Sequence, residues 1–317
     1  MIHKRFLDSI QVEDLKKVLS VNESYDIDVI RPFFMEAYLF VKDFLDKELD
    51  QIVPRYEDKS ITTEQSYTRE LILYPLLKYV LYKSELQASV QRSGLGISLI
   101  KTENVIPVEL KRLEIMRNEH LIAAYNGLNM LLEHLGKKPP LFIQDAVELQ
   151  EYVNCERNHY LFYKMIPDLK YIQRYYLESL MGSALYQKFV TEFSLGTLNP
   201  LRKEAMNEYI KPFLAHKIWA ISLPKFLLNV EMKLYVESLG ISGNPAELGV
   251  PLSKTAMNIT QIALDDSERK ADFFIDSLNK FLYKNYRQLP DFENWEGFRK
   301  PNEIELINDP DNTYYSF

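Results

Sequence analysis

The alternation of apolar and polar residues between positions 107 and 136 predicts the best-defined helix of the chain. Pro107 suits the first turn of a helix, where its missing N–H would have no partner anyway. Gly136 suits the left-handed position that often follows the last turn. The apolar residues between them follow the spacing of one helix face: Leu110, Leu113, Leu121, Ala124, Leu128, Leu131 and Leu135. Arg117 interrupts this stripe, so we expect its turn to meet water or a partner.

Residues 251–284 repeat this pattern. Pro251 opens the stretch, and its apolar positions lie seven apart with two phenylalanines between them: Met257, Leu264, Ala271 and Leu278, then Phe274 and Phe281. A shift of 150 positions carries the core of the first helix onto the second: Leu121, Ala124, Leu128 and Leu131 fall on Ala271, Phe274, Leu278 and Phe281. The chain therefore contains two long amphipathic helices of one kind.

Landmarks ahead of these helices recur in the same order. Pro75 and Pro212 are 137 positions apart, and Pro107 and Pro251 are 144 apart. Earlier still, a shift of 136 carries three residues of the first copy onto three of the second: Phe40, Phe44 and Leu45 onto Tyr176, Leu180 and Met181. The offset only grows, as insertions into one of two duplicated copies would make it. Chance register between two helical bundles is the alternative explanation, and two copies are too few for a solenoid.

Caps and prolines delimit the other helices of the first half. We expect a helix over residues 30–51, which Pro54 ends. Thr62 and Gln65 have the spacing of a capping box and open the next helix. Pro75 should break or kink that helix after one to three turns.

The second half carries matching signals. The pattern predicts a helix over residues 168–188, with Gly182 near its end. The aromatic residues 159–165 just before it follow no clear period. Asn199 and Pro200 open the following helix, which two later prolines should kink.

We therefore predict an all-α protein made of two fused, duplicated helical bundles with an extended C-terminal arm. Residues 1–138 form the first bundle, residues 139–285 form a linker helix and the second bundle, and residues 286–317 form the arm. We expect the tyrosines at helical spacing to lie in the bundle cores, with their hydroxyls at the rim: Tyr74, Tyr79, Tyr82, Tyr175, Tyr176 and Tyr186.

The arm is acidic and rich in aromatic residues. Residues 286–317 hold seven acidic and three basic side chains and no helical stripe. Its six aromatic residues of the type favoured at interfaces are the candidate partner-binding anchors: Phe292, Trp295, Phe298, Tyr314, Tyr315 and Phe317. Because disordered acidic tails are usually poor in aromatics, we expect a docking arm that could add a strand to a partner sheet. The alternative is that the arm folds back on its own bundle.

Composition and charge exclude several classes of protein. The 317 residues include only 10 glycines, which favours helix, and carry a formal net charge of −7, which argues against broad nucleic-acid binding. The single cysteine, Cys155, leaves no internal disulfide and is typical of a reducing compartment. The first residues lack the apolar core of a signal peptide. The longest apolar run, residues 212–230, contains charged residues and prolines, so we expect a buried helix rather than a membrane span.

The candidate metal-binding patterns are incomplete. Glu156 and His159 have the ExxH spacing of di-iron helical bundles, but the chain lacks a second such pair. Asp265 and Asp266 begin like the magnesium motif of helical terpenoid enzymes, and Arg269 stands where that motif needs another acid.

The candidate catalytic and phosphate-binding patterns are incomplete as well. Cys155 lies one helical turn from His159, but no third residue is placed to orient the pair. Gly94 and Gly96 lack the flanking strand and helix of a phosphate loop. We therefore predict no catalytic, cofactor-binding or metal-binding residue.

Several segments between residues 9 and 285 carry a family resemblance. In the first half they are VEDLKKVLSVN at 12–22, IRPFFMEAYLF at 30–40, YPLLKYVLYKSEL at 74–86, SVQRSGLGI at 89–97 and LNMLLEHLG at 128–136. In the second half they are ALYQKF at 184–189, IKPFLAHKIWAISLP at 210–224 and LNKFLYKN at 278–285. These segments resemble the head-to-tail adaptor, or connector ring, proteins of tailed bacteriophages, in particular those of phages of Bacteroidetes hosts, including the crAss-like group.

The resemblance implies a structural protein of the virion neck, assembled in the host cytoplasm. Similar adaptors form rings, commonly of twelve subunits, that join the portal to the tail and let DNA pass through the lumen. An acidic surface is compatible with such a channel, because a strongly basic one would hold the DNA. The expected partners are other copies of the chain, the portal protein and other neck or tail proteins.

The chain departs from a single-copy adaptor in its duplication, in its aromatic arm, and in having Asp46 where the second copy has Gly182. Two other classes of function stay open. One is a helical protein-interaction scaffold outside any virion. The other is a helical enzyme with an unrecognised site, which a deep polar pocket with converging acids or histidines would reveal.

Overall fold

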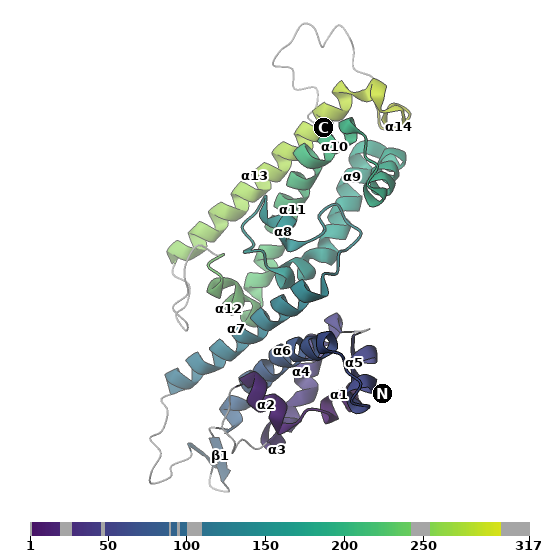
Figure 1. Cartoon of the computed structure of the whole chain (residues 1–317). Coiled ribbons are helices and arrows are strands. Elements are labelled where there is room, and N and C mark those ends of the chain that lie inside the picture. Colours follow the sequence, from purple (N-terminus) through teal and green to yellow (C-terminus); the bar gives the residue numbers. More distant parts are fainter. Residues whose placement is uncertain are drawn as a thin grey trace. The chain divides into compact units, whose positions relative to one another are not determined.

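The computed structural model describes residues 2–19, 27–45, 48–88, 90–93, 96–99, 110–241 and 254–298 (Figure 1). The chain splits into two compact units. Among the described residues, unit 1 comprises residues 2–137 together with Val230–Gly240, and unit 2 comprises Lys138–Asn229, Ile241 and residues 254–298. Helices dominate both units, so the predicted all-α fold is confirmed.

Unit 1 is a bundle of helices with one short hairpin. In chain order its helices are α1 (Ile2–Asp8), α2 (Val12–Leu19), α3 (Ile27–Ile30), α4 (Phe34–Val41), α5 (Glu48–Glu57), α6 (Thr63–Ala88), α7 (Leu110–Leu135) and α12 (Val230–Ser238). The 3₁₀ turns Arg31–Phe33 and Lys42–Phe44 flank α4. Strands β1 (Val90–Ser93) and β2 (Gly96–Leu99) pair antiparallel, with Ser93 opposite Gly96, so a strand does precede Gly94, contrary to the sequence-based expectation.

The core of unit 1 lies between α6 and α7. The predicted stripe of α7 is its buried face, since Leu121, Ala124, Leu128 and Leu131 are all fully buried. Gly127 allows a close approach to α6: a Cβ added there would lie 2.7 Å from Tyr74 Cδ1 and 3.0 Å from Pro75 Cδ. α6 continues through Pro75 as one helix, so the break expected there does not occur. The predicted capping box is confirmed by two reciprocal hydrogen bonds, from Thr62 N to Gln65 Oε1 (3.1 Å) and from Gln65 N to Thr62 Oγ1 (3.2 Å).

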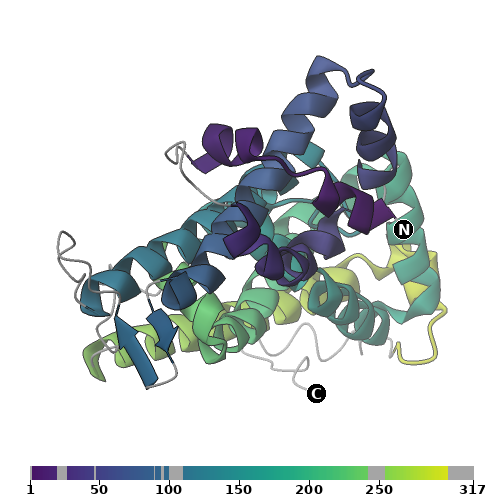
Figure 2. The same cartoon turned by 90° about the horizontal axis from the view of Figure 1, so that it is seen from below.

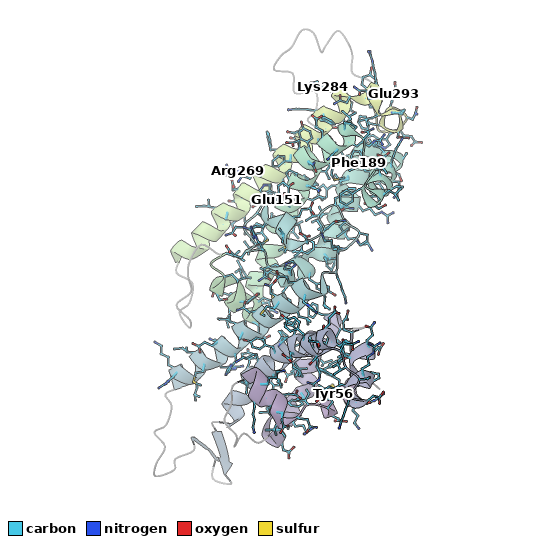
Figure 3. All side chains as sticks on the ribbon, in the orientation of Figure 1. Tyr56, Glu151, Phe189, Arg269, Lys284 and Glu293 are labelled. Carbon is cyan, nitrogen blue, oxygen red and sulfur yellow. The ribbon has the colours of Figure 1, made fainter. Side chains whose placement is uncertain are left out.

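Two arginines fasten other parts of unit 1 to α6. Arg69 pairs with Asp14 of α2 through two bonds of 2.6 and 3.0 Å, and its guanidinium lies 4.0 Å from the ring centroid of Tyr56, which Figure 3 labels. Arg117 of α7 donates to the backbone oxygen of Tyr82 at 3.1 Å and lies over the Tyr82 ring at 4.4 Å. The interruption in the α7 stripe therefore has a partner within unit 1.

α12 belongs to unit 1, although the residues on both sides of it belong to unit 2. Tyr235 is fully buried and stacks on Tyr125 of α7, with 4.8 Å between ring centroids. Glu231 lies 3.4 Å from Lys83 Nζ, which also pairs with Glu36 of α4 at 3.0 Å. Residues 230–240, which we predicted within the second bundle, are thus part of the first. The predicted boundary differs from the observed one because Tyr235 of α12 stacks on Tyr125, which belongs to α7 of unit 1.

The charge on Lys83 is maintained despite its partial burial. Burial acts to lower the pKa of Lys83, but hydrogen bonds with Glu36 and Tyr79 and the nearby carboxylate of Glu231 raise it above the ordinary value. The ion pairs that join α12 and α4 to α6 therefore persist through neutral pH.

Unit 2 contains the longest helices. They are α8 (Ala146–Gln150), α9 (His159–Leu195), α10 (Pro200–Ala205), α11 (Lys211–Leu228), α13 (Lys254–Lys284) and α14 (Pro290–Glu293), with a π-helical turn at Met206–Ile210 and a 3₁₀ turn at Tyr286–Gln288 (Figures 1 and 2). Asn199 caps α10 by accepting from Arg202 N at 2.8 Å, as predicted. The π turn just ahead of Pro212 is the departure from regular helix that the proline predicts.

Two helix boundaries predicted from the sequence are wrong, one in α9 of unit 2 and one in α5 of unit 1. Residues 159–165, which show no clear period, form the first turns of α9, because Asn158 caps it by accepting from Leu161 N at 2.9 Å. Pro54 lies inside α5 rather than ending it. Leu49, Ile52 and Val53 are buried and hold that helix against the unit, which compensates for the one backbone hydrogen bond that Pro54 cannot make.

The two units share a packing order. In unit 1, α4 packs against α6 and α6 against α7; in unit 2, α9 packs against α11 and α11 against α13. The central helix carries a proline in both, Pro75 in α6 and Pro212 in α11. Ala271 and Leu278 of α13 are fully buried, like the two residues of α7 that the shift of 150 places on them. Among the described helices, none combines the length and hydrophobicity needed to cross a membrane.

Replacing Gly127 by Val should loosen the contact between α6 and α7. The new side chain would collide with Tyr74 and the Pro75 ring, so we expect a loss of about 1–3 kcal/mol of unfolding free energy. Denaturant unfolding followed by circular dichroism measures this loss. Val at the neighbouring exposed position, Asn126→Val, is the matched control and should cost no more than about 0.7 kcal/mol. Equal losses for the two variants would contradict the close packing at Gly127.

Truncating Tyr235 should destabilise unit 1. We expect Tyr235→Ala to cost about 3–5 kcal/mol, because it removes a buried ring from the surface of α7. Backbone amide hydrogen exchange should be faster in the variant than in the wild type in α6 and α7, the helices of unit 1 that lie nearest to Tyr235. Val230→Ala, at a side chain that is 75% exposed on the same helix, should leave exchange unchanged. Faster exchange confined to unit 2 in Tyr235→Ala would argue against the assignment of α12.

Candidate interaction surface

Three of the six predicted anchors lie within unit 2. Phe292 is fully buried and meets the Tyr283 ring edge-on at 5.3 Å. Phe298 stacks on Tyr283, with 5.3 Å between centroids. The part of the predicted arm up to residue 298 therefore folds back on its own bundle, which is the alternative given above. Phe292 is buried in this arrangement, whereas Trp295 and Phe298 are half-buried and their role in partner binding stays a prediction. The other three anchors, Tyr314, Tyr315 and Phe317, lie outside the described residues.

Trp295 is seated on a kink in α9. Gly182 has φ 77° and ψ 156°, a conformation that joins two helical halves at a bend. A Cβ at Gly182 would lie 2.6 Å from two indole carbons of Trp295, so only glycine leaves room for the ring. Lys188 pairs with Asp291 at 2.9 Å beside this contact. We identified both Gly182 and Trp295 from the sequence. Their contact could not be predicted, because it depends on a bend in α9 that helical periodicity does not indicate.

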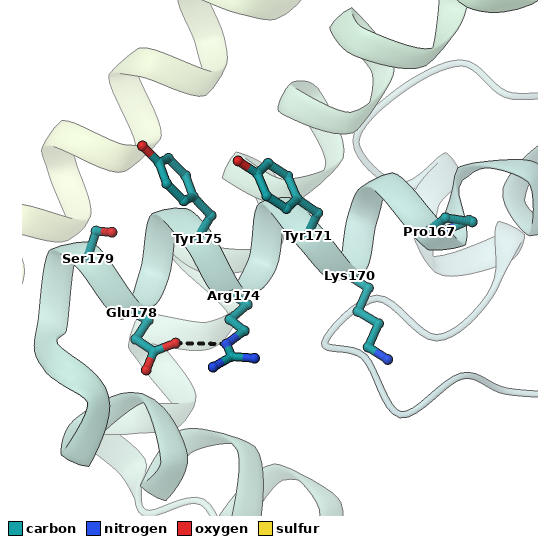
Figure 4. A pocket seen from close by; sticks show the side chains of 7 residues that line it. All are labelled: Pro167, Lys170, Tyr171, Arg174, Tyr175, Glu178 and Ser179. Atoms are coloured by element: carbon teal, nitrogen blue, oxygen red, sulfur yellow. Dashed lines mark hydrogen bonds and ion pairs between the residues drawn. The ribbon is translucent and has the colours of Figure 1, made fainter.

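α9 presents a pair of exposed aromatic residues ahead of this bend. Tyr171 is 63% exposed and Tyr175 is 56% exposed, and their rings stack at 5.4 Å with an angle of 11° between planes. They lie one helical turn apart on the same side of α9 (Figure 4). The prediction that Tyr175 lies in the bundle core is therefore wrong, because the core side of this turn is occupied by Ile172 and Gln173.

Charged side chains extend from another side of the same turns of α9. Lys170, Arg174 and Glu178 follow each other at helical spacing and, with the two tyrosines, line a surface pocket (Figure 4). Arg174 Nε donates to Glu178 at 3.0 Å, and this hydrogen bond lowers the pKa of Glu178. We call Lys170, Tyr171, Arg174, Tyr175 and Glu178 the α9 face. It combines apolar area with a net positive charge.

Unit 1 has an exposed apolar pair at the corresponding positions of α4. The shift of 136 that aligns the first helices of the two copies carries Met35 onto Tyr171 and Leu39 onto Tyr175. Met35 is 47% exposed and Leu39 is 51% exposed. We call these two residues the α4 face.

The buried sides of the two helices match in part. Ala37 and Val41 of α4 are buried, and so are the residues at the shifted positions, Gln173 and Leu177 of α9. Two other positions differ, because Phe34 is buried where Lys170 is exposed, and Glu36 is exposed where Ile172 is buried. The comparison needs the exposed fractions of these side chains, so residue type at the shifted positions alone does not identify Tyr171 and Tyr175 from the sequence.

The rejected chemical motifs have ordinary structural surroundings. Cys155 is fully buried, and burial raises the pKa of its thiol to about 11, so it is protonated at neutral pH. Cys155 Sγ lies 3.6 Å from the backbone oxygen of Ala146. Asp266 pairs with Lys270 at 2.7 Å on an exposed side of α13. Within the part of the chain that the structure describes, no group of three or more His, Cys, Asp or Glu side chains is arranged to hold a metal ion.

One comparison with known proteins gives a match. The model of a family described as being of unknown function, DUF6712, matches residues 28–148 and 177–302, which together are more than half of the chain. The first segment contains the α4 face, and the second begins just after Tyr175. No curated protein and no solved structure matches the chain.

Replacing Gly182 by Ala should release Trp295 from α9. The variant combines backbone strain with a collision against the indole, so we expect a loss of about 2–4 kcal/mol. Gly196→Ala is the matched control, because Gly196 also has positive φ (67°) but a Cβ there would meet nothing within 4 Å. It should cost only about 1–2 kcal/mol. Thermal unfolding measures both values, and a smaller loss for Gly182→Ala than for Gly196→Ala would refute the proposed contact.

Proposed function

We propose that this chain, which belongs to the DUF6712 family, is a structural virion protein that forms a ring in the head-to-tail connector of a tailed bacteriophage. In this proposal the ring lies between the portal and the tail, and DNA passes through its lumen. The chain binds other proteins and performs no reaction.

The observation that carries the proposal is the pair of matching exposed faces. The α4 face and the α9 face each present two large apolar side chains on the outer side of the corresponding helix, between 47% and 63% exposed. Clustered apolar side chains on an otherwise charged surface are typical of protein–protein contacts. A chain with two such faces can contact two neighbours, which is the minimum that a closed ring requires.

The assignment to a phage connector is supported by the sequence resemblance. The segments that carry it form elements of both bundles: residues 30–40 cover all of α4 except its last residue, residues 74–86 lie in α6, and residues 210–224 contain the start of α11 with Pro212. Each of these segments contributes buried side chains to its unit. The net charge of −7 also suits a conduit through which a polyanion must slide.

Light scattering coupled to size-exclusion chromatography and negative-stain microscopy test this function. We expect the purified chain to form closed rings of one size. Serine substitution of all four exposed residues (Met35, Leu39, Tyr171 and Tyr175) should leave the helical circular-dichroism signal intact and abolish rings.

A control with four substitutions at other exposed apolar side chains separates the two faces from nonspecific hydrophobic association. Met130 of α7, Val147 of α8, Leu195 of α9 and Ile262 of α13 are 50%, 48%, 68% and 64% exposed. The variant with serine at these four positions should still form rings. A wild-type protein that stays monomeric at high micromolar concentration would overturn the ring proposal, and a small fixed oligomer without a lumen would favour an interaction scaffold.

A further inference from the structure

The α9 face has a composition that selects among partners. Lys170 and Arg174 are both exposed and outnumber the single acid, Glu178, and the rings of Tyr171 and Tyr175 stack on the adjoining side of the helix. The α4 face differs, because its two exposed apolar side chains, Met35 and Leu39, are aliphatic and offer no stacked rings. A segment that combines acids with aromatic rings therefore fits the α9 face better than the α4 face.

The chain itself contains a segment of that composition. Residues 301–317 carry four acidic side chains and no lysine or arginine: Glu303, Glu305, Asp309 and Asp311. Three aromatic residues follow these acids, namely Tyr314, Tyr315 and Phe317. The order, acids first and aromatics after, allows carboxylates to meet Lys170 and Arg174 while the rings stack on Tyr171 and Tyr175.

We propose that residues 301–317 of one copy bind the α9 face of a second copy of this chain. The proposal deepens the proposed function, on which it rests for the assembly of copies. It names the surface and the segment that would join neighbouring subunits. Because the two partners of the contact are different surfaces, the contact is head-to-tail, the kind that closes into a ring when the rotation between copies fits.

The packing of Phe292 and Phe298 fixes the point from which residues 299–317 start, and so sets the distance that they can span. Phe292 is fully buried and Phe298 is stacked on Tyr283, so the segment leaves from a fixed point on unit 2. The residues from 299 to 317 could span up to about 60 Å if extended, at roughly 3.3 Å per residue. That distance is larger than the diameter of a helical bundle of this size, so the α9 face of an adjacent copy is within range.

Charge reversal in the full chain tests the contact. Lys170→Glu/Arg174→Glu, the face variant, should weaken self-association at least tenfold in analytical ultracentrifugation. Lys203→Glu/Lys280→Glu changes the net charge equally at exposed positions on α10 and α13 and should associate like the wild type. Adding Glu303→Lys, Glu305→Lys, Asp309→Lys and Asp311→Lys to the face variant restores opposite charges and should recover association to within about threefold.

A mixing experiment separates binding between copies from binding within one copy. The tail variant carries Glu303→Gln, Glu305→Gln, Asp309→Asn and Asp311→Asn. Alone, it and the face variant should both associate poorly. Mixed, they should form a 1:1 complex that grows no further, since only one intact tail can meet one intact face. Absence of that complex would overturn docking between copies.

The outcomes also distinguish this inference from the proposed function. If the wild type forms rings and the face variant forms them equally well, the inference fails while the ring proposal stands. If the wild type is monomeric under all conditions, the ring proposal fails. Unchanged circular-dichroism spectra in the face and tail variants exclude misfolding as the cause of lost association.

Discussion

Each unit depends on the burial of one long amphipathic helix against a proline-bearing helix. In unit 1 this is α7 on α6, where Gly127 brings the two backbones close beside Pro75. In unit 2 it is α13 on α11. The other elements attach to these pairs: Arg69 fastens α2 to α6, Tyr235 fastens α12 to α7, and α9 packs on α11. With the inner sides of α4 and α9 fixed in this way, their outer sides remain available for contacts between molecules.

Features that depend on local chemistry could be predicted from the sequence. The α7 stripe, the capping box at Thr62 and the cap at Asn199 each involve residues within one or two turns of each other. Helical spacing also identified the second long helix. In these places the short-range hydrogen bonds and the burial of a face favour the same structure, so the local signal is sufficient.

Features that depend on distant partners could not be predicted in this way. The sequence left water or a partner open for Arg117, and only the structure identifies the partner as Tyr82. Pro54 suggests a helix end, but it lies inside α5, whose neighbouring residues are buried. Phe292 reads as an interface anchor, yet the bend at Gly182 and the Tyr283 ring give this segment a place inside unit 2. Tyr175 was predicted to lie in the core because it is aromatic and at helical spacing, but its side chain is exposed on the surface. Residue type alone does not decide between a core and an interface, because both bury aromatic rings.

The membership of α12 has a consequence for any division of the chain. A simple tandem fusion yields two products that a single cut can separate again, whereas here a fragment ending at Lys137 would lack α12 and leave Tyr125 and Lys83 uncovered. The fragment that begins at Lys138 would contain α12 without its packing partners in unit 1, and Tyr235 would be exposed to solvent. Dividing the chain once between the two units would therefore leave neither unit with its complete set of helices.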